Sequence, residues 1–360
     1  MQGCWHLHLH LHLRGAGGVV VFAAVALLGG ACGSPPAGGS TALELGALGH
    51  PASVTARDGG ASVLVQGQML WLFGDSLLNV TSSDGFTFRS STAAWGSGAG
   101  LTLTEPVDAA GAPFQLLPYT ADELAYNRAG GPNERFALWP LGATVDGASG
   151  ALIFYSYLKV HPGNLNYEGL GVGVARLALG ETVATRQPGL LFAPPEPGFC
   201  TGSVVAGGFV HLYACDAIAG AVDSACRVAR APLGEATVHD SYRVWDGAGW
   251  NADLTAGQPV VHGAPGEMTV SWNEHLGAFL AVHSAIFSDE IVFHTAPAPE
   301  GPWAAPQRLM IGQHHAGTTN YAGREHPELS TNGGATLFVT YAHPLGGFDE
   351  DVRAAAPVLP

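Results

Sequence analysis

The hydrophobic residues of this chain occur in short runs that are separated by turn-forming residues. Five apolar runs share one length and character: residues 69–75, 151–157, 209–215, 278–284 and 336–342. Each is preceded, across a tight turn, by a shorter strand-like run: residues 61–65, 143–145, 203–206, 268–272 and 327–331. Because apolar runs bounded by turn residues are typical of antiparallel strands, the pattern predicts five β-hairpins.

A third strand-like element recurs after four of these hairpins. It begins at Val174, Val228, Val292 and Val352, which sets a repeat of about 60 residues. Repeats of this kind, each a meander of short antiparallel strands, are typical of propeller blades. No run of ten or more residues keeps a helical period of 3.6 residues. We therefore predict an all-β fold, a five-bladed β-propeller of four-stranded antiparallel blades, with two separate β-sandwiches as the alternative.

The N-terminal residues are typical of an export signal. The apolar stretch of residues 18–31 is too short for a membrane-spanning helix, which needs about 20 residues. It ends in Ala31-Cys32-Gly33-Ser34, which resembles the lipobox of bacterial lipoproteins, so Cys32 is the predicted lipidation site. A cleaved secretion signal is the alternative. The predicted divisions are a signal peptide (1–31), a flexible tether (32–44) and a single propeller domain (45–360).

Residues 6–13 alternate between His and Leu, a run that has no place in an export signal. We interpret it as the product of a start codon assigned too far upstream rather than as a metal site. Export also fits the cysteines. Cys215 and Cys226 flank a short segment between two strand-like runs and are the predicted disulfide, which leaves Cys200 as an odd thiol.

Composition narrows the function classes. The chain has 14 Lys and Arg against 29 Asp and Glu, a formal charge of −15, which leaves no basic footprint for nucleic acid. Its 47% hydrophobic and 12% charged residues exclude a disordered chain or a coiled coil. No paired short Cys or His spacing predicts a zinc site, so we predict no metal or cofactor, with a structural calcium ion in the channel as the alternative. A monomer is expected.

Propeller geometry gathers polar residues at one face. The first strand of a blade lines the channel and the second returns antiparallel to it, so the start of the first and the end of the second meet. In the first blade this rule brings Asp58 near Asp75. In blades two, four and five the same rule places further acids, imidazoles and a tryptophan at this face: Glu134, Trp139, Glu267, His283, Glu325, His326 and His343. Blade three offers only Cys200, Thr201 and Asp216.

A ring of carboxylates is what cleavage of a glycosidic bond requires. One carboxyl protonates the leaving oxygen, and a second activates water or attacks the anomeric carbon. Crowded carboxylates also separate one another's pKa values, so that one keeps its proton. The predicted catalytic residues are Asp58, Asp75, Glu134 and Glu267, and the predicted substrate-binding residues are Glu325, His326, Trp139, His283 and His343. The alternatives are turn capping for the aspartates, solvated loop positions for the glutamates and core packing for the histidines and Trp139.

Several strings resemble one known family. In chain order they are Arg57-Asp-Gly-Gly60, Leu70-Trp-Leu-Phe-Gly-Asp-Ser76, Glu267-Met-Thr-Val-Ser-Trp-Asn273, Glu300-Gly-Pro-Trp303 and His326-Pro-Glu-Leu329. Over residues 45–356 the chain is similar to domain-of-unknown-function family 4185. The resemblance implies a five-bladed propeller similar to the arabinanase and fructosidase propellers, with endo-D-arabinanase activity in some members. The family's two early acidic positions match Asp58 and Asp75.

Two positions depart from the family's pattern. Ser76 stands where Thr is commoner, and Arg57 replaces the usual small or hydroxyl residue. The expected function is that of a glycoside hydrolase that is secreted or lipid-anchored at the cell envelope. Its expected substrate is a polysaccharide, for example a furanose-containing one such as arabinan. The expected partners are that polysaccharide and, through the lipid, the membrane. The alternative is a non-catalytic propeller that binds glycan or docks a protein.

Overall fold

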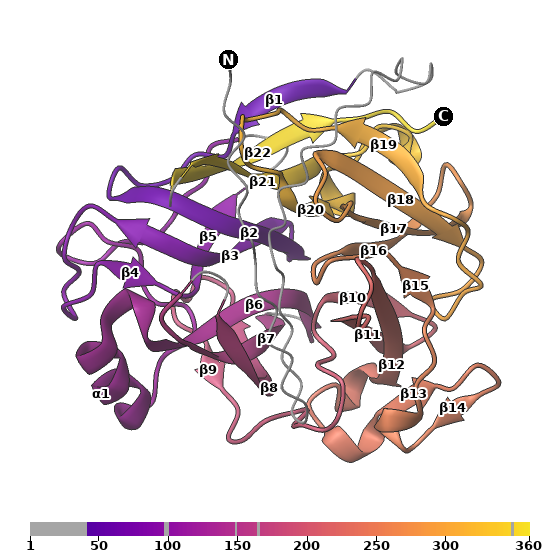
Figure 1. The fold of residues 1–360 in the computed structure, drawn as a ribbon, viewed down its shortest axis with the longest axis horizontal. Coiled ribbons are helices and arrows are strands. Elements are labelled where there is room, and N and C mark those ends of the chain that lie inside the picture. The colour runs from indigo at the N-terminus through magenta and orange to yellow at the C-terminus, as the bar shows by residue number, and fades with distance from the viewer. Residues whose placement is uncertain (1–41, 97–100, 148–149, 164–165, 347–348) are drawn as a thin grey trace, which may run out of the picture.

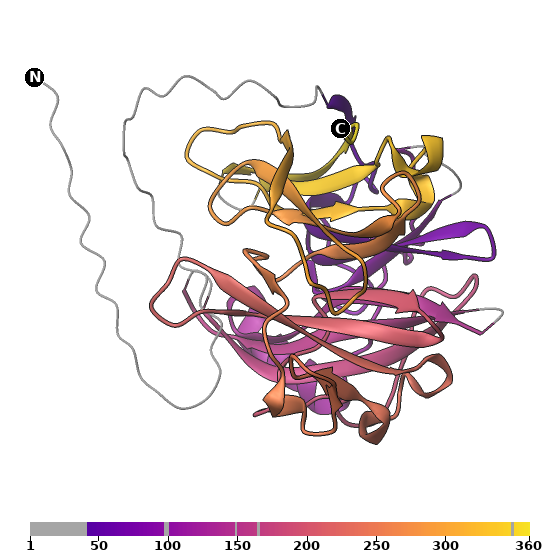
Figure 2. The ribbon, with the colours of Figure 1, turned by 90° about the vertical axis from the view of Figure 1, so that its right-hand side faces the viewer.

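In the computed structural model, five antiparallel sheets stand around a central axis (Figure 1). The structure describes residues 42–360 except 97–100, 148–149, 164–165 and 347–348. Viewed from the side, the yellow C-terminal strands lie next to the indigo start of the described chain (Figure 2). The predicted all-β, five-bladed propeller is confirmed.

Each blade is one sheet of consecutive strands. Blade 1 holds β2 (Val54–Val65), β3 (Gln68–Leu78), β4 (Phe88–Arg89) and β5 (Thr92–Gly96), and blade 2 holds β6 (Arg135–Asp146), β7 (Gly150–Val160), β8 (Tyr167–Ala178) and β9 (Thr185–Arg186). Blade 4 holds β16 (Thr269–Asn273), β17 (Ala278–Ser284), β18 (Glu290–Ala296) and β19 (Gln307–Ile311).

Blade 3 has two strands more than the others. Its sheet holds β10 (Gly202–Ala206), β11 (Phe209–Ala217), β12 (Ser224–Pro232), β13 (Arg243–Trp245), β14 (Trp250–Asn251) and β15 (Val261–His262). Short 3-10 turns lie beside these strands: η2 (Leu233–Glu235), η3 (His239–Ser241) and η4 (Leu254–Ala256).

Blade 5 joins the two ends of the described chain. Its sheet runs from β20 (Tyr321–Glu325) through β21 (Val339–Gly346) and β22 (Asp349–Ala356) to β1 (Leu43–Ala47). β1 pairs antiparallel with β22, and Tyr341 Oη donates a hydrogen bond to Glu44 Oε1 over 2.8 Å. An N-terminal strand therefore completes the last blade, and it begins inside the segment predicted as a tether.

The inner strand of blade 5 lies earlier than predicted. We expected it at residues 327–331, but Tyr321–Glu325 is the strand, and the chain then forms the 3-10 turns η5 (Pro327–Leu329) and η6 (Asn332–Gly334). Because Pro327 has no N–H to give to a ladder, the strand ends before it. The apolar run that we assigned to the second strand starts at residue 336, whereas β21 begins at Val339.

One helix was also missed. α1 (Ala121–Gly130) begins with a capping box in which Thr120 Oγ1 accepts from the Glu123 amide and the Glu123 carboxylate accepts from the Thr120 amide. η1 (Gly131–Asn133) follows it. The buried residues of the helix are Glu123 and Asn127, so its inner face is polar and carries no hydrophobic period. No helix in the described residues is long and apolar enough to span a membrane.

Apolar side chains from adjacent blades form the core between the sheets. Phe154 and Val174 of blade 2 belong to one cluster with Val210 and Leu212 of blade 3. Leu280 and Val282 of blade 4 likewise share a cluster with Val339 of blade 5. Removal of this apolar surface from water contributes about 25 cal/mol per Å² and holds the blades together, which leaves the strand ends free to carry function.

Candidate active site

The first two carboxylates come from facing positions of β2 and β3. These strands pair Arg57 with Ser76 and Gly59 with Phe73, and the bulge between the two pairs sets Asp58 opposite Gly74 and Asp75. A Cβ atom at Gly74 would overlap Oδ1 of Asp58, so glycine leaves the space in which the Asp58 carboxylate lies over the backbone of β3. In the string Phe73-Gly74-Asp75, Gly74 therefore leaves space for the Asp58 carboxylate, and Asp75 supplies the second acid.

Asp75 is held by two donors from β6. Arg135 Nη2 donates to Oδ2 over 2.6 Å and Trp139 Nε1 donates to Oδ1 over 2.7 Å. Burial raises the pKa of Asp75, while the Arg135 charge and both hydrogen bonds act to lower it. The Asp75 side chain stays 26% exposed, so it is fixed in position and still open to a ligand.

Asp58 and Glu350 share one phenol. Tyr321 Oη lies 2.7 Å from Glu350 Oε2 and 3.2 Å from Asp58 Oδ2. A phenol has a single proton, so both contacts are satisfied when Tyr321 donates to one carboxylate and the other carboxyl carries a proton of its own. Burial and the charges of Glu350, Asp75 and Glu267 raise the pKa of Asp58 well above its usual range. Burial also raises the pKa of Glu350 to about 7.

Glu267 faces the same space from blade 4. Arg324 binds its Oε2 through Nη2 at 2.9 Å and Nε at 3.1 Å. The Glu267 charge raises the pKa of both Asp58 and Glu350, so the three carboxylates are within electrostatic reach of one another. Asp58, Asp75, Glu267 and Glu350 are called the carboxylate cluster below. All four residues are partly exposed.

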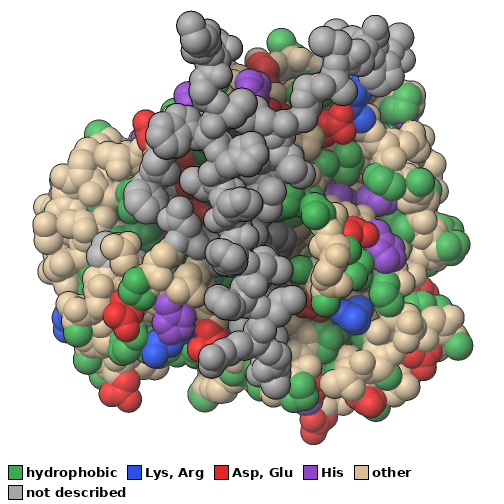
Figure 3. Space-filling view, in the orientation of Figure 1, with side chains coloured by type: hydrophobic (Ala, Val, Ile, Leu, Met, Phe, Trp, Pro, Cys, Tyr) green, Lys and Arg blue, Asp and Glu red, His purple; other side chains and the backbone are tan. Residues whose placement is uncertain are grey.

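Aromatic side chains from blade 2 border the cluster. Tyr167 meets Trp139 edge to face, with ring centroids 5.4 Å apart. Burial and the charge of Glu267 raise the pKa of Tyr167 to about 12, which places this ring near the blade 4 acid. Trp139 and Tyr167 therefore offer apolar ring surface beside the acids, as sugar recognition requires. On the face drawn in Figure 3, Lys and Arg side chains are fewer than Asp and Glu side chains.

The sequence placed Asp58, Asp75, Glu267 and Trp139 at this face, and the structure brings all four together. Glu350, Tyr321, Arg135 and Arg324 were missed. Glu350 lies at the start of β22, which meets the end of β21 through the pair Pro344 and Glu350. The start of a third strand lies at the same face as the end of the second, so the acidic run Asp349-Glu350-Asp351 was a signal that the first two strands alone do not reveal.

The other predicted residues have hydrogen-bond partners outside the cluster. Glu134 accepts a hydrogen bond from Tyr126 Oη of α1 over 2.7 Å. His343 is 2% exposed, and its Nδ1 lies 2.8 Å from Asn320 Oδ1. His283 is 1% exposed and contacts a second histidine. These histidines therefore pack in the interior and present no surface to a substrate.

Glu325 and His326 are also interior groups. Ser271 Oγ donates to Glu325 Oε2 over 2.7 Å. His326 is fully buried between Ser62 Oγ and Thr340 Oγ1, each 2.7 Å from a ring nitrogen. We therefore withdraw both from the substrate-binding set. The strand-end rule gives the height of a residue along a blade but not the side of the sheet to which it points.

The cysteines are placed as follows. Cys215 and Cys226 are opposite each other on β11 and β12 and form a disulfide. Cys200 is buried and free, and burial raises the pKa of its thiol to about 12, so it is no nucleophile at neutral pH. The predicted lipidation site Cys32 lies outside the described residues.

Within the described residues, no three His, Cys, Asp or Glu side chains are grouped so that they could hold a metal ion.

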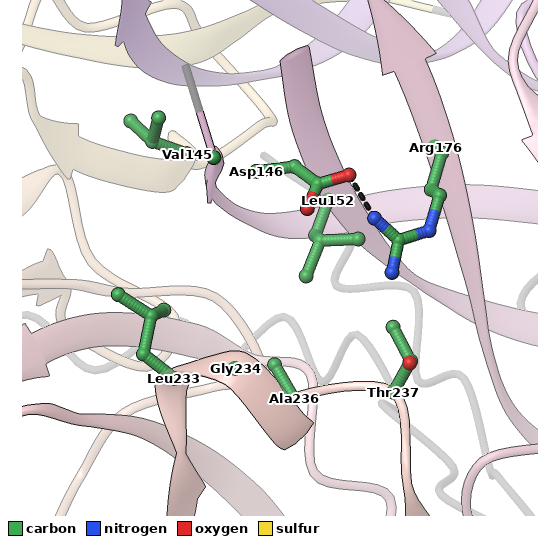
Figure 4. A pocket seen from close by; sticks show the side chains of 9 residues that line it. Val145, Asp146, Leu152, Arg176, Leu233, Gly234, Ala236 and Thr237 are labelled. Carbon is green, nitrogen blue, oxygen red and sulfur yellow. Dashed lines mark hydrogen bonds and ion pairs between the residues drawn. The ribbon is translucent and has the colours of Figure 1, made fainter. Parts of the chain in front are cut away.

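A separate hollow of about 360 Å³ lies between β6, β8 and η2 (Figure 4). Leu152, Leu233 and Ala236 line it, and Arg176 forms an ion pair with Asp146 at its edge. Its lining includes none of the predicted catalytic or substrate-binding residues. The carboxylate cluster, rather than this hollow, is therefore the candidate site.

The fold defines a class, the five-bladed β-propellers. The family model of the domain of unknown function DUF4185 matches residues 194–343, which supports the resemblance seen in the sequence over blades 3 to 5. No curated protein matches the sequence.

Solved structures share the fold at low identity. A protein of Bacteroides ovatus ATCC 8483, provisionally assigned as a hydrolase, aligns with a TM-score of 0.61 and 13% identity, covering 86% of this chain and 87% of its own. The family 117 glycoside hydrolase Zg3597 of Zobellia galactanivorans aligns with a TM-score of 0.53 and 12% identity, and the alignment covers 89% of this chain and 91% of Zg3597. The α-L-arabinofuranosidase PaAbf62A of Podospora anserina, in complex with cellotriose, aligns with a TM-score of 0.51 and 11% identity. The alignment covers 89% of this chain and 98% of PaAbf62A.

Proposed function

We propose that this protein is a glycoside hydrolase that cleaves a furanose-containing polysaccharide such as arabinan. Its catalytic carboxylates would be Asp58 and Asp75. The observation that carries this proposal is the carboxylate cluster, in which two acids share the Tyr321 hydroxyl, two are paired with arginines, and all four face one partly exposed space. Glycosidic cleavage needs such a pair. The propeller glycosidases that share the fold support the proposal, and the arabinofuranosidase among them supports a furanose substrate.

The two halves of the cluster suit different steps. Asp58, Tyr321 and Glu350 together hold a proton at neutral pH, so this group can protonate the leaving oxygen. Asp75 is paired with Arg135 and is the candidate for the ionised partner that activates water or attacks the anomeric carbon. Arg135 and Arg324 balance the charges of Asp75 and Glu267.

The first test is a screen of the purified protein against arabinan, arabinogalactan, fructan and xylan, with released oligosaccharides as the readout. Asp58→Asn and Asp75→Asn are each expected to lower kcat/KM on the cleaved glycan by about 1,000-fold or more, because each removes one half of the acid–base pair. The kcat/KM of the wild type should fall as pH rises through about 7, where Glu350 loses its proton.

Asp146→Asn is the matched control, because Asp146 is also paired with an arginine but lines the hollow between blades 2 and 3. It should keep full activity. If both cluster variants cleave as well as the control, the assignment of the site is wrong. If the wild type binds one of the glycans without releasing oligosaccharides, the protein is a binding module.

We also propose that the protein is exported and lipid-anchored through Cys32, acting as a monomer at the cell envelope. The support is the apolar stretch of residues 18–31 and the Ala-Cys-Gly-Ser string that ends it. Cys32→Ser is expected to move the protein from the membrane fraction to the soluble fraction of cells. An unchanged distribution would indicate a cleaved secretion signal or retention by another route.

A further inference from the structure

An exposed apolar side chain recurs at one register of the inner strands. In blades 1 to 4 the next-to-last residue of the inner strand is apolar and open to solvent: Leu64 (39% exposed), Val145 (38%), Val205 (44%) and Trp272 (45%). These strands, β2, β6, β10 and β16, stand around the central axis (Figure 1). The four residues are called the apolar ring below.

The apolar ring lies at the face opposite the carboxylate cluster. Asp58 comes six residues before Leu64 in β2, a distance of about 20 Å along an extended strand. In blade 4, Glu267 precedes β16, whereas Trp272 is near the end of that strand. The face that carries the apolar ring is called the far face, and it is separate from the candidate active site.

The ring side chains project in the same sense around the axis. Ser203, two residues before Val205, donates through Oγ to a backbone carbonyl oxygen of blade 2. Ser62, two residues before Leu64, contacts His326 of blade 5. Because side chains alternate along a strand, Val205 and Leu64 also point toward the preceding blade. Single exposed apolar residues are ordinary at protein surfaces, but these repeat with the blades.

The described chain enters the fold at the far face. β1 is antiparallel to β22, and its first residue, Leu43, pairs with Ala356, the last residue of β22. Because β22 starts beside the cluster, where Glu350 lies, its end and the start of β1 are at the far face. Leu43 is 65% exposed, and Val358, just beyond β22, is 46% exposed. Blade 5 therefore adds apolar surface to the same face.

The chain between Cys32 and Leu43 is short compared with the domain. Its eleven residues span about 40 Å at most and about 18 Å as a flexible coil. A compact domain of this length is about 50 Å across. A lipid on Cys32 would therefore keep the far face next to the membrane.

We propose that the apolar ring docks on the lipid bilayer, so that the far face lies on the membrane and the carboxylate cluster faces away from it. This inference rests on the lipid anchor proposed above. An acyl anchor attaches a protein without orienting it, and an apolar surface beside the anchor supplies a second contact. Trp272 suits the boundary between headgroups and acyl chains, where tryptophan is enriched.

The turns beside the apolar ring favour an apolar contact over an ionic one. Residues 66–67, 147–149, 207–208 and 274–277 join the inner strands of blades 1 to 4 to their second strands, and they contain no Lys or Arg. Basic residues would add attraction to anionic lipids, and salt would screen it. Docking should therefore occur on uncharged lipids and persist in high salt.

The test uses the protein as cells produce it, reconstituted with phosphatidylcholine vesicles whose acyl chains are plain or brominated. Bromine quenches a tryptophan that touches the acyl chains, so the brominated vesicles should lower the tryptophan emission of the parent chain. Trp272→Phe should abolish this loss of emission. Trp139→Phe is the matched control at the opposite face, and it should retain the loss.

A second pair of variants leaves every tryptophan in place. Leu64→Gln combined with Val205→Gln should reduce the quenching, because both substitutions make the apolar ring polar. The control, Val222→Gln combined with Ile311→Gln, changes exposed apolar residues near the strand ends of the site face and should quench as the parent does. High salt should leave the quenching of the parent unchanged.

Vesicle flotation and the mass of the peptide that holds Cys32 test the anchor separately. If the acylated protein floats without being quenched, or if Trp139→Phe abolishes the quenching, docking through the apolar ring is wrong and the anchor stands. If Cys32 is unmodified and vesicles still quench Trp272, the docking stands and the anchor fails. An unmodified protein that vesicles do not quench contradicts both. A dimer that Leu64→Gln with Val205→Gln dissociates would assign the apolar ring to a second copy of the chain and overturn the proposal.

Discussion

A single phenol hydroxyl organises the acid chemistry of the candidate site. Tyr321 Oη contacts Asp58 and Glu350, and only one of them can accept its proton. Arg135 and Arg324 meanwhile hold the carboxylates of Asp75 and Glu267 as ion pairs. At the residue scale, the four acids are therefore unequal because of their neighbours, although the side chains themselves are nearly the same.

A buried carboxyl outside the cluster makes stability depend on pH. Burial raises the pKa of Glu325 from 4.5 to about 7. Between these values the folded state binds the proton that the unfolded state has lost, so stability is full below about pH 4.5 and falls as pH rises through about 7. Glu325→Gln, which carries no charge, should remove a slope of up to about 1.4 kcal/mol per pH unit. The free energy of unfolding, measured in urea at pH 5, 6, 7 and 8, gives this slope for both proteins.

The control for this prediction is Glu134→Gln, a half-buried carboxyl that accepts from Tyr126 on the surface helix. It should keep the pH slope of the wild type. At pH 8, Glu325→Gln should also be more stable than the wild type. Equal slopes in all three proteins would mean that Glu325 does not hold its proton in the folded state.

At the scale of elements, hairpins with turn-forming residues were predictable because each is specified locally. The alternation of apolar runs and Gly-rich turns identified the first two strands of four blades. Blade 5 differed because its inner strand, Tyr321–Glu325, reads Tyr-Ala-Gly-Arg-Glu, which is not an apolar run, and is soon followed by Pro327. The helix α1 escaped notice because it buries polar groups against the blade, so its position depends on tertiary contacts.

The bulge between β2 and β3 gives a prediction at this scale. Gly74→Ala would place a methyl group against the Asp58 carboxylate, which can rotate away at small cost to the fold. Activity on the cleaved glycan should fall by about 100-fold, because a displacement of about 1 Å at a reacting group costs that much. The Tm should change by no more than about 2 °C. Steady-state kinetics and thermal unfolding measure the two effects.

Gly234→Ala is the matched control, because a Cβ atom there meets open space. It should change neither quantity. Full activity in Gly74→Ala would show that the contact between Asp58 and the β3 backbone does not set the geometry of the acid. A large fall in Tm would show that the bulge is needed for folding.

At the scale of the whole molecule, the ring closes through one strand. β1 supplies the fourth strand of blade 5, and Leu48 N donates to the Val352 carbonyl oxygen over 2.8 Å just beyond it. Glu44 and Glu350 belong to the same sheet, at β1 and at β22. Closure therefore stabilises the blade that contributes both Tyr321 and Glu350 to the site.

Removal of β1 should weaken the entire propeller. A chain that begins at Leu48 is compared with one that begins at Ala42. The shorter chain is expected to melt about 5 °C or more below the longer one and to aggregate on heating, because β22 becomes an unpaired edge. Differential scanning calorimetry and light scattering measure this. If the two chains melt together, β1 does not close the ring.

The sequence by itself determined the strand pattern, the propeller class and the acids at the start of β2 and the end of β3, since each depends on residues that are near in the chain. The tertiary structure alone decided which side chains meet. Asp58 and Tyr321 lie 263 positions apart, and Asp75 and Arg135 lie 60 apart. Contacts between blades depend on how sheets twist and pack, and a local pattern does not encode that. For the same reason, His326 and Glu325 lie in the core while Glu350 belongs to the partly exposed carboxylate cluster.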